Sequence, residues 1–345
     1  MNMQERTRTA RRKRKKKGKG LVIFIAVLSV MAILGLFFSD IMSKVSNTID
    51  VITQNVGNRT EQEANEIIQN AKPINVLLLG IDNGAYGRST DEGRADTMLL
   101  LTINPSSKQS QLLSIPRDTY TEIVGNNTYD KINHAYSFGR VPMAVNSVEK
   151  LLDTTIDFYV EINMGGLMEF VDALGGIEVT SPLTFTYEGR SFVEGKTELL
   201  DGESALRFAR MRYDDPEGDN GRQKRQRIVI SQLVKKLMTF DSLSKYENIL
   251  KAARNNVKTD IPIKHLLALK NTYGPAVDHL TQLFFEETPL YLPNEDGEEI
   301  FYFYASDEEL LEKANSIRKL QEQPLVQTYP LLQERIDYSA MVSQE

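Results

Sequence analysis

Short apolar runs and longer helical patterns alternate along the middle of this chain. Apolar runs at residues 75–81, 97–103 and 111–115 are bounded by turn-forming residues and predict β-strands. Both faces of these runs are apolar, which is typical of a central sheet that is covered by helices. Further strands are predicted at 158–162 and 177–180, and two late strands, 283–287 and 299–304, are expected to pair with each other.

Apolar residues at spacings of three and four predict helices between these strands. The clearest helix is 141–152, where Pro142 lies in the first turn and is tolerated there. A second helix at 167–174 is closed by Gly175 and Gly176. Other helices are predicted at 204–211, 222–240, 248–255, 262–273 and 307–320. The alternation indicates an α/β domain with a mixed central sheet and helices on both of its faces.

An uncharged segment of 19 residues, 21–39, precedes this pattern. As a helix it would span roughly 28 Å, which is close to the hydrocarbon core of a bilayer. Residues 1–20 contain ten Lys or Arg and one acid, which predicts a basic cytoplasmic tail and an extracellular remainder. A cleaved signal peptide is the main alternative, but no Ala-x-Ala-like site follows the segment. The sequence therefore favours a retained transmembrane helix and a single-pass protein of the cell membrane.

The remaining chain divides by composition into four parts. Residues 40–72 are polar with one apolar helical stripe, which indicates a helical stalk, or alternatively a short dimerising coiled coil. Residues 73–240 form the main α/β domain. We expect residues 241–320 to be an α/β extension that packs on this domain or continues it, and residues 321–345 to be a loosely ordered tail.

The composition narrows the possible chemistry. The chain has 345 residues, a net charge of -6 and no cysteine, which excludes disulfides and Cys-based metal sites. An exported protein without disulfides favours a bacterium with a single membrane. The three histidines, His134, His265 and His279, lack metal-ligand spacing and are expected to be surface or packed residues.

Arginines gather around one acidic, glycine-containing loop between residues 210 and 227. The six members of this group are Arg207, Arg210, Arg212, Arg222, Arg225 and Arg227. A guanidinium group matches two oxygens of a phosphate and keeps its proton at any physiological pH. Several such groups at the two ends of one loop predict a site for a ligand that carries more than one phosphate.

Carboxylates stand at the ends of the predicted strands, and ligands collect at strand ends in α/β sheets. Asp82 follows the first strand, Asp96 precedes the second, and Arg117 and Asp118 follow the third. One such carboxylate alone is better explained as a structural salt bridge. Asp82 and Asp96 together, near several arginines, favour a hard cation such as Mg²⁺. Lys131, taken alone, is better explained as solvated than as a phosphate ligand.

Five motifs in this order resemble the LytR–CpsA–Psr family over residues 73–240. They are residues 75–82, Arg94-x-Asp96, residues 114–118, residues 131–135, and Arg210-x-Arg212 with Gly218, Asp219, Arg222, Arg225 and Gln226. The resemblance implies a cell-wall enzyme of Gram-positive bacteria. Such an enzyme moves an anionic glycopolymer, such as wall teichoic acid or capsular polysaccharide, from a polyprenyl-pyrophosphate carrier to the 6-hydroxyl of N-acetylmuramic acid in peptidoglycan. A phosphodiester forms and the lipid phosphate is released.

The resemblance also implies a role for each matched residue. Asp82 and Asp96 would hold Mg²⁺ or Mn²⁺, and these two are expected to be catalytic together with Arg117 and Arg212. The pyrophosphate would be bound by Arg94, Arg117, Lys131, Arg210, Arg212, Arg222 and Gln226. Asp219 would orient these arginines, and the polyprenyl tail would lie in an apolar tunnel between sheet and helices. Asp82 or Asp96 is also the candidate general base.

Three other functions fit parts of the same sequence. A pyrophosphatase would use the same site with water as the acceptor. A membrane-bound regulator of transcription would bind nucleic acid through residues 6–19. A non-catalytic module would bind the lipid without forming a product. Because a basic run beside a membrane span is more often a topology signal, we expect the bilayer, the lipid-linked glycopolymer and peptidoglycan as partners, and no nucleic acid.

Overall fold

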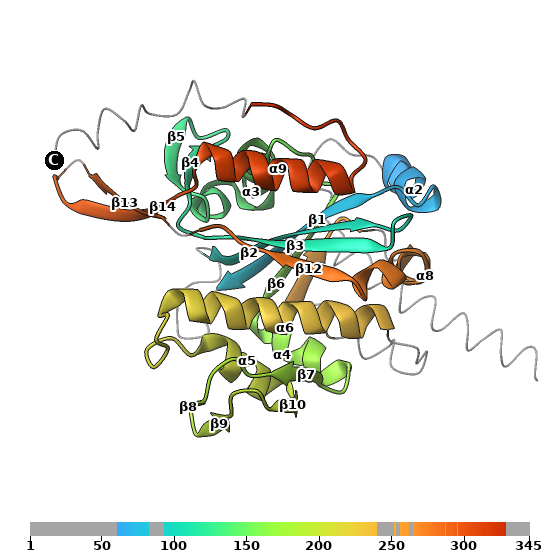
Figure 1. The fold of residues 1–345 in the computed structure, drawn as a ribbon, viewed down its shortest axis with the longest axis vertical. Helices are drawn as coiled ribbons and strands as arrows, with labels where there is room; N and C mark the ends of the chain where they lie inside the picture. Colours follow the sequence, from blue (N-terminus) through green and yellow to red (C-terminus); the bar gives the residue numbers. More distant parts are fainter. Residues whose placement is uncertain are drawn as a thin grey trace, which may run out of the picture. The chain divides into compact units, whose positions relative to one another are not determined.

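The computed structural model describes residues 61–82, 93–239, 252, 256–261, 265–286, 288–294 and 296–328. Within these ranges a six-stranded sheet, in the order β11-β6-β1-β2-β3-β12, lies between layers of helices (Figure 1). The prediction of a mixed central sheet with helices on both faces is therefore confirmed. None of the helices in the described ranges is both long and apolar enough to span a bilayer. The expected basic tail at 1–20 and the anchor at 21–39 lie outside the described residues.

The strands of the central sheet run in both directions. They are β1 (Ile74–Asp82), β2 (Arg94–Asn104), β3 (Gln109–Ile115), β6 (Phe158–Asn163), β11 (Val257–Thr259) and β12 (Leu280–Leu283). β1 pairs antiparallel with β2 and parallel with β6, and β3 pairs antiparallel with β2 and parallel with β12. β2 and β3 are joined by a tight turn, whereas each parallel pair needs a longer crossover that contains a helix.

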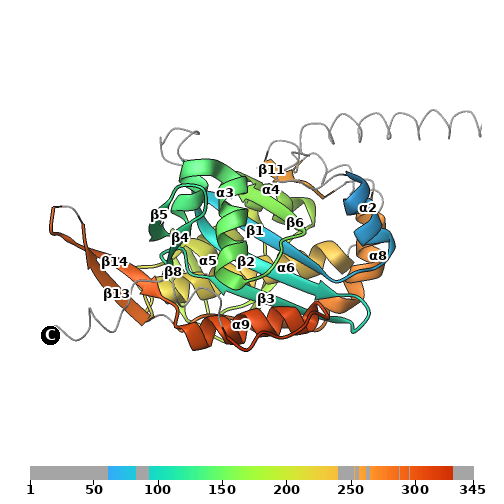
Figure 2. The ribbon, with the colours of Figure 1, turned by 90° about the horizontal axis from the view of Figure 1, so that it is seen from above.

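Helices cover both faces because the central strands are apolar on both sides. α3 (His134–Leu152) and α9 (Asp307–Leu320) pack on the face that presents Leu77 and Leu79. α8 (Leu266–Val277) packs on the opposite face, beside α6 (Asp219–Thr239) (Figure 1). α2 (Glu61–Gln69) lies at the end of the sheet and packs with α8 in the same hydrophobic cluster (Figures 1 and 2). α4 (Met164–Ala173) and α5 (Gly202–Arg210) form a further hydrophobic cluster with α6.

A kink divides α3 into two helical segments. Gly139 and Arg140 have non-helical backbone angles, and Arg140 has a φ of 57°. Pro142 follows this break, so it lies in the first turn of the second segment, where its missing N–H leaves no helical bond unmade. The prediction of a helix that begins near residue 141 is confirmed, and the structure adds the shorter segment before it.

Small two-stranded sheets surround the central one. They are β4 (Tyr120–Ile123) with β5 (Thr128–Lys131), β7 (Ile177–Thr180) with β10 (Thr197–Leu200), β8 (Phe185–Tyr187) with β9 (Arg190–Phe192), and β13 (Thr288–Pro293) with β14 (Glu299–Tyr304). The expected pairing of 283–287 with 299–304 is wrong, because β12 joins β3 and β14 pairs with β13. β13 was not predicted from the sequence, because it contains Pro289 and Pro293 and proline argues against a strand interior.

The described residues beyond 240 complete the central sheet. β11 and β12 supply its two edge strands, and α9 covers one face. The beginning of the expected tail also has a fixed path, because Asn315 Nδ2 donates to the Val326 carbonyl at 2.9 Å and Arg318 Nε donates to the Pro324 carbonyl at 2.8 Å. At the other end, Ala64 and Ile68 of the expected stalk are buried in the core. Most of the helix predicted at 248–255 lies outside the described residues.

Candidate active site

A β-bulge in β2 sets the position of Asp96. The ladder pairs Gly80 with Thr97 and Ile81 with Ala95, so Asp96 is the extra residue between them. A bulge re-aims the side chains around it, and here Asp96 and Thr97, although adjacent in sequence, line the same small cavity. Gly80 permits the close approach, since a Cβ at this position would lie 2.9 Å from the Thr97 Cβ.

Arg117 links this bulge to the turn that follows β3. Its Nη1 lies 3.1 Å from Asp96 Oδ1, and its Nε lies 3.4 Å from Asp118 Oδ2. Lys131 Nζ lies 2.9 Å from the other oxygen of Asp118. The four side chains are between 13% and 22% exposed, so alternating charges form a largely buried row that solvent still reaches.

Backbone hydrogen bonds fold the β4–β5 hairpin back over Asp118. The Thr119 N–H donates to the Pro116 carbonyl at 3.0 Å, and the Asn133 N–H donates to the Arg117 carbonyl at 3.2 Å. Tyr120 is the cross-strand partner of Lys131. This pairing brings the lysine next to the turn after β3. Lys131 is therefore held in an ion pair and is not simply solvated.

Asp130, the residue before Lys131, forms a second anchoring contact. Its Oδ2 lies 2.7 Å from His134 Nδ1, and its Oδ1 accepts the Lys131 backbone N–H at 2.8 Å. Burial raises the pKa of the Asp130 carboxyl, but the bonds from His134 and Lys131 and their charges outweigh it, so the pKa lies below its ordinary value. This contact joins the end of β5 to the start of α3.

α6 contributes Gln226, whose Oε1 accepts a hydrogen bond from Thr97 Oγ1 at 3.1 Å. Arg222 precedes Gln226 by one helical turn and shares its face. The cavity between β2, β3 and α6 measures about 10 Å³, which is room for about one water molecule. A pyrophosphate is too large for this cavity, so it would have to bind outside it, at the solvent-accessible atoms of the row.

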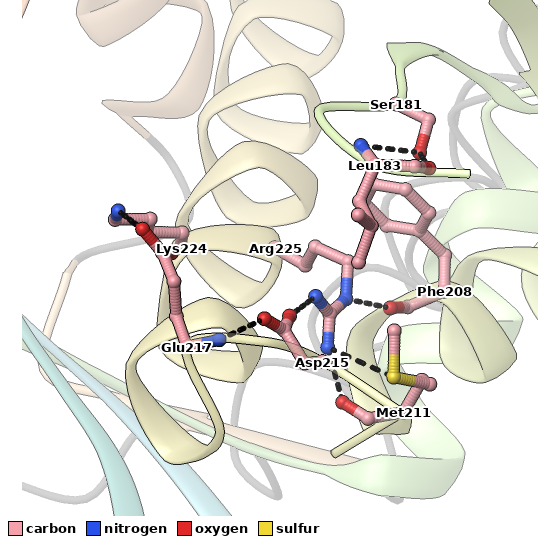
Figure 3. Close-up of polar contacts among 8 residues, drawn as sticks. All are labelled: Ser181, Leu183, Phe208, Met211, Asp215, Glu217, Lys224 and Arg225. Carbon is pink, nitrogen blue, oxygen red and sulfur yellow. Dashed lines mark hydrogen bonds and ion pairs between the residues drawn. The ribbon is translucent and has the colours of Figure 1, made fainter. Parts of the chain in front are cut away.

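Arg225 belongs to the scaffold of the arginine loop. Its side chain is about 1% exposed, and its Nε donates to the Phe208 carbonyl at 3.0 Å (Figure 3). The remaining guanidinium nitrogens donate to the Met211 carbonyl and to Asp215 Oδ2. Lys224 and Glu217 pair on the outside of the same loop at 2.6 Å. The loop 211–218 is thus held by Arg225 on its buried side and by Lys224 on its exposed side.

Three of the six arginines around this loop are held in other contacts or buried. Arg225 and Arg227 are buried, and Arg207 pairs with Glu203 at 2.7 Å on the surface of α5. Arg210 ends α5 and Arg212 follows it in the loop with an exposed side chain. Arg210, Arg212 and Arg222 therefore stay as the candidates from this segment. Arg225 shares a four-residue spacing with Val229 and Leu233, and this is the sequence signal for its burial.

The structure places the other predicted residues as follows. Asp82 and Arg94 are cross-strand partners at the end of the β1–β2 ladder, two positions from Asp96. Arg94 is exposed. Asp219 begins α6, and its side chain, like that of Asp82, lies outside the described part of the structure. Asp215, which was not among the predicted site residues, pairs with Arg225 of α6. The orienting role of Asp219 stays a prediction. The apolar tunnel stays a prediction.

No cluster of three or more His, Asp or Glu side chains among the described residues is arranged to hold a metal ion. One oxygen of Asp96 is paired with Arg117. The described residues thus show the salt bridge that was the simpler expectation for a single carboxylate. A metal site shared by Asp82 and Asp96 stays a prediction.

Comparisons with known proteins agree on one family. The profile described as the LytR_cpsA_psr family matches residues 39–319. The polyisoprenyl-teichoic acid–peptidoglycan teichoic acid transferase TagU of Enterococcus faecalis is 43% identical over 262 residues, which is 76% of this chain and 83% of that protein.

Solved structures share the fold. A crystal structure from Enterococcus faecalis, described as a transcriptional regulator, is 37% identical with a TM-score of 0.66 and covers 80% of this chain and 96% of that chain. A structure of TagT bound to LI-WTA is 26% identical with a TM-score of 0.58 and covers 73% of this chain and 92% of that chain.

Proposed function

This chain belongs to the LytR–CpsA–Psr family, and we propose that it transfers an anionic glycopolymer from a polyprenyl-pyrophosphate carrier to the muramic acid 6-hydroxyl of peptidoglycan. The family that the motifs predicted is confirmed, and the match extends beyond residues 73–240 to 39–319. Wall teichoic acid is favoured as the polymer, because the TagU relative is named a teichoic acid transferase and TagT has been solved with LI-WTA.

One observation carries the proposal, which is the convergence of separate elements on one row of charges. Asp96 comes from the bulge in β2, Arg117 from the turn after β3, and Lys131 from the end of β5. α6 adds Gln226 through its hydrogen bond with Thr97. Such a largely buried row of fixed cations and carboxylates supports phosphoryl transfer, because the charges are set in place before the substrate arrives.

In the proposed reaction the sugar hydroxyl attacks the phosphorus next to the polymer. A new O–P bond forms, the P–O bond to the lipid phosphate breaks, and the hydroxyl proton passes to a carboxylate, for which Asp82 and Asp96 are the candidates. Negative charge builds up on the equatorial oxygens and on the leaving lipid phosphate. Arg117, Arg212 and Arg222 would stabilise this charge, and their guanidinium groups stay protonated throughout.

A divalent cation fits the donor set that this end of the sheet offers. Asp82 and Asp96 lie on paired strands and Asp96 reaches solvent, and Mg²⁺ is often bound by one or two carboxylates plus phosphate oxygens of the substrate. Mg²⁺ or Mn²⁺ would neutralise phosphate charge there. Arg117 pairs with Asp96, and that contact would hold the carboxylate in position.

The test uses the full-length protein in detergent with lipid-linked wall teichoic acid, with and without peptidoglycan fragments. Arg117→Ala and Arg212→Ala should each lower transfer by about 100-fold or more while the protein still folds. Arg207→Ala is the matched control, because Arg207 pairs with Glu188 and Glu203 at the surface, and it should transfer at the parental rate. Normal transfer by either site variant would refute the assignment. Lipid phosphate release without peptidoglycan, and no transfer with it, would identify a pyrophosphatase.

The location of the domain is also part of the proposal. The uncharged segment at 21–39 would anchor the protein in the cell membrane, with residues 1–20 in the cytoplasm and the α/β domain outside. Protease added to intact cells after removal of the wall should then digest the α/β domain. Full protection of that domain would contradict the topology and would restore the regulator of transcription as a candidate.

A further inference from the structure

We propose that the β13–β14 hairpin, here called the aromatic arm (residues 288–304), binds the glycan strand of peptidoglycan beside the site. The inference rests on the function proposed above and identifies where the acceptor is held. Its occupant would be a chain of amino sugars without phosphate groups.

The aromatic arm is a preformed hairpin. β13 and β14 pair from Thr288 with Tyr304 at its base to Pro293 with Glu299 near its tip. The Asn294 side chain accepts the N–H groups of Asp296 at 3.1 Å and Glu298 at 2.7 Å, which orders the turn. Figures 1 and 2 both show the arm reaching out from the end of the sheet near β4 and β5. Binding to such an arm requires little ordering of the backbone.

The base of the arm is attached to the charged row. The Phe303 N–H donates to the Asp118 carbonyl at 2.8 Å, and Phe303 and Thr119 form a parallel bridge. Lys131 Nζ lies 5.6 Å from the centre of the Tyr302 ring, within the range of a cation–π contact. Because Asp118 also pairs with Arg117, a ligand lying on the arm would extend directly from the site.

Aromatic rings follow one side of the arm from its tip toward its base. The Tyr291 and Phe301 rings meet edge to face at 5.6 Å, and Phe301 meets Phe303 in the same way at 5.0 Å. Tyr291 is 57% exposed, and neither Tyr291 nor Phe301 belongs to the hydrophobic clusters of the described residues. The C–H faces of pyranose rings pack on aromatic rings, so the exposed Tyr291 ring and the partly exposed Phe301 ring beside it offer a surface on which a sugar can stack.

The negative charge of the aromatic arm distinguishes between its possible ligands. Asp296, Glu298 and Glu299 are exposed around the tip. These carboxylates repel the phosphates of the donor polymer and the anionic headgroups of a bilayer. A glycan strand without phosphates meets no such repulsion, so the acceptor is the substrate that fits the arm.

The experiment measures binding of the full-length protein in detergent to purified peptidoglycan sacculi stripped of attached polymer. The Tyr291→Ala/Phe301→Ala variant should sediment with sacculi at least about fivefold more weakly than the parent. Leu199→Ala removes an equally exposed apolar side chain from β10, at 61% exposure, and should bind as the parent does. Tyr291→Ser is a milder variant for the case in which the double variant fails to fold, and it should show a smaller loss in the same direction.

Transfer assays then separate this inference from the proposed function. A raised KM for peptidoglycan fragments with unchanged use of the lipid-linked donor supports the arm as the acceptor site. Parental sacculus binding by the folded arm variants overturns the inference even if the parent transfers polymer normally. Arm-dependent binding to phosphatidylglycerol vesicles instead of sacculi also overturns it. A parent that binds sacculi through the arm and transfers nothing refutes the proposed function and leaves the arm as a glycan-binding site.

Discussion

Arg225 and Asp215 form an ion pair that is almost completely enclosed, with side chains 1% and 4% exposed. The same guanidinium also reaches the carbonyls of Phe208 and Met211, so one residue of α6 holds both the end of α5 and the loop after it. A charge in this position is tolerated only while its partners are present. The exposed Arg212 is carried by this loop, so the ion pair is a condition for its placement.

Replacing Arg225 with alanine should lower the free energy of unfolding by about 3–5 kcal/mol, because it leaves the Asp215 carboxylate buried without a partner. Urea denaturation of the purified domain measures this loss. Arg207→Ala serves as the control, since a surface pair contributes no more than about 1 kcal/mol. Equal stability of the two variants would show that the enclosed pair does not hold the loop.

Gly221→Ala should also destabilise the protein, although alanine is normally the better helix residue by about 1 kcal/mol. A Cβ at this position would lie 1.9 Å from Asp215 Oδ2, which Arg225 holds in place. We expect a loss of about 1–3 kcal/mol. Gly165→Ala in α4 is the comparison, because its nearest contact is an ordinary 3.4 Å and it should be neutral or stabilising. A stabilised Gly221→Ala variant would mean that Asp215 can move aside.

Gly80→Ala should impair the reaction more than it impairs folding. The added methyl group would push Thr97 away and break its bond with Gln226, so we expect about a tenfold loss of transfer. Thr97→Val tests the bond without the clash and should show a smaller loss of kcat with a nearly unchanged melting temperature. Full activity of both variants would remove Gln226 from the site.

Removal of divalent cations should stop transfer if Asp82 and Asp96 hold Mg²⁺ or Mn²⁺ with the substrate phosphates. Chelator treatment followed by Mg²⁺ addition should abolish and then restore the activity. Ligand binding raises stability by mass action, so Mg²⁺ together with a pyrophosphate should raise the melting temperature of the parent. Asp96→Asn should reduce this rise. Transfer at the normal rate in the presence of chelator would refute the metal assignment.

The Asp130–His134 contact should make stability depend on pH in the acid range. Hydrogen bonds from His134 and Lys131 lower the Asp130 pKa in spite of burial, so the folded protein binds this proton less readily than the unfolded chain. The stabilisation is therefore complete above the unfolded value of about 3.9 and is lost as pH falls through the folded value.

Asp130→Asn is accordingly expected to be less stable than the parent at pH 7, by less than about 1 kcal/mol, since the pair is partly solvated. The difference should shrink toward pH 3. Melting curves at both pH values measure it. A constant difference across that range would show that the charge of Asp130 does not contribute.

Much of the fold was accessible from local patterns, and the parts that were missed have physical explanations. The apolar runs at β1, β2 and β3 and the helix after residue 141 were predicted, because two buried faces and a proline in a first turn leave clear signals. The bulge at Asp96 was not, since it depends on Gly80 across the ladder. The pairing of the late strands was predicted wrongly because it depends on long-range contacts. β12 pairs with β3, which lies about 170 residues earlier in the sequence.

The candidate site, like the fold, was predicted from the sequence only in part. Asp96, Arg117, Lys131 and Gln226 were selected from the sequence, and the structure brings them to one end of the sheet. The burial of Arg225 was not predicted, because the sequence around the loop does not distinguish a buried arginine from an exposed one. Burial distinguishes them, and it depends on how α5 packs against α6.

The strands at the two borders of the central sheet both come from the last third of the chain. Until β11 and β12 have been synthesised, β6 and β3 keep unpaired backbone groups along one side, and such open borders invite other chains to pair with them. The nascent protein therefore passes through an association-prone form before these strands are made. Any shortened version for crystallisation or screening must keep the chain through these strands, however complete the earlier motifs look.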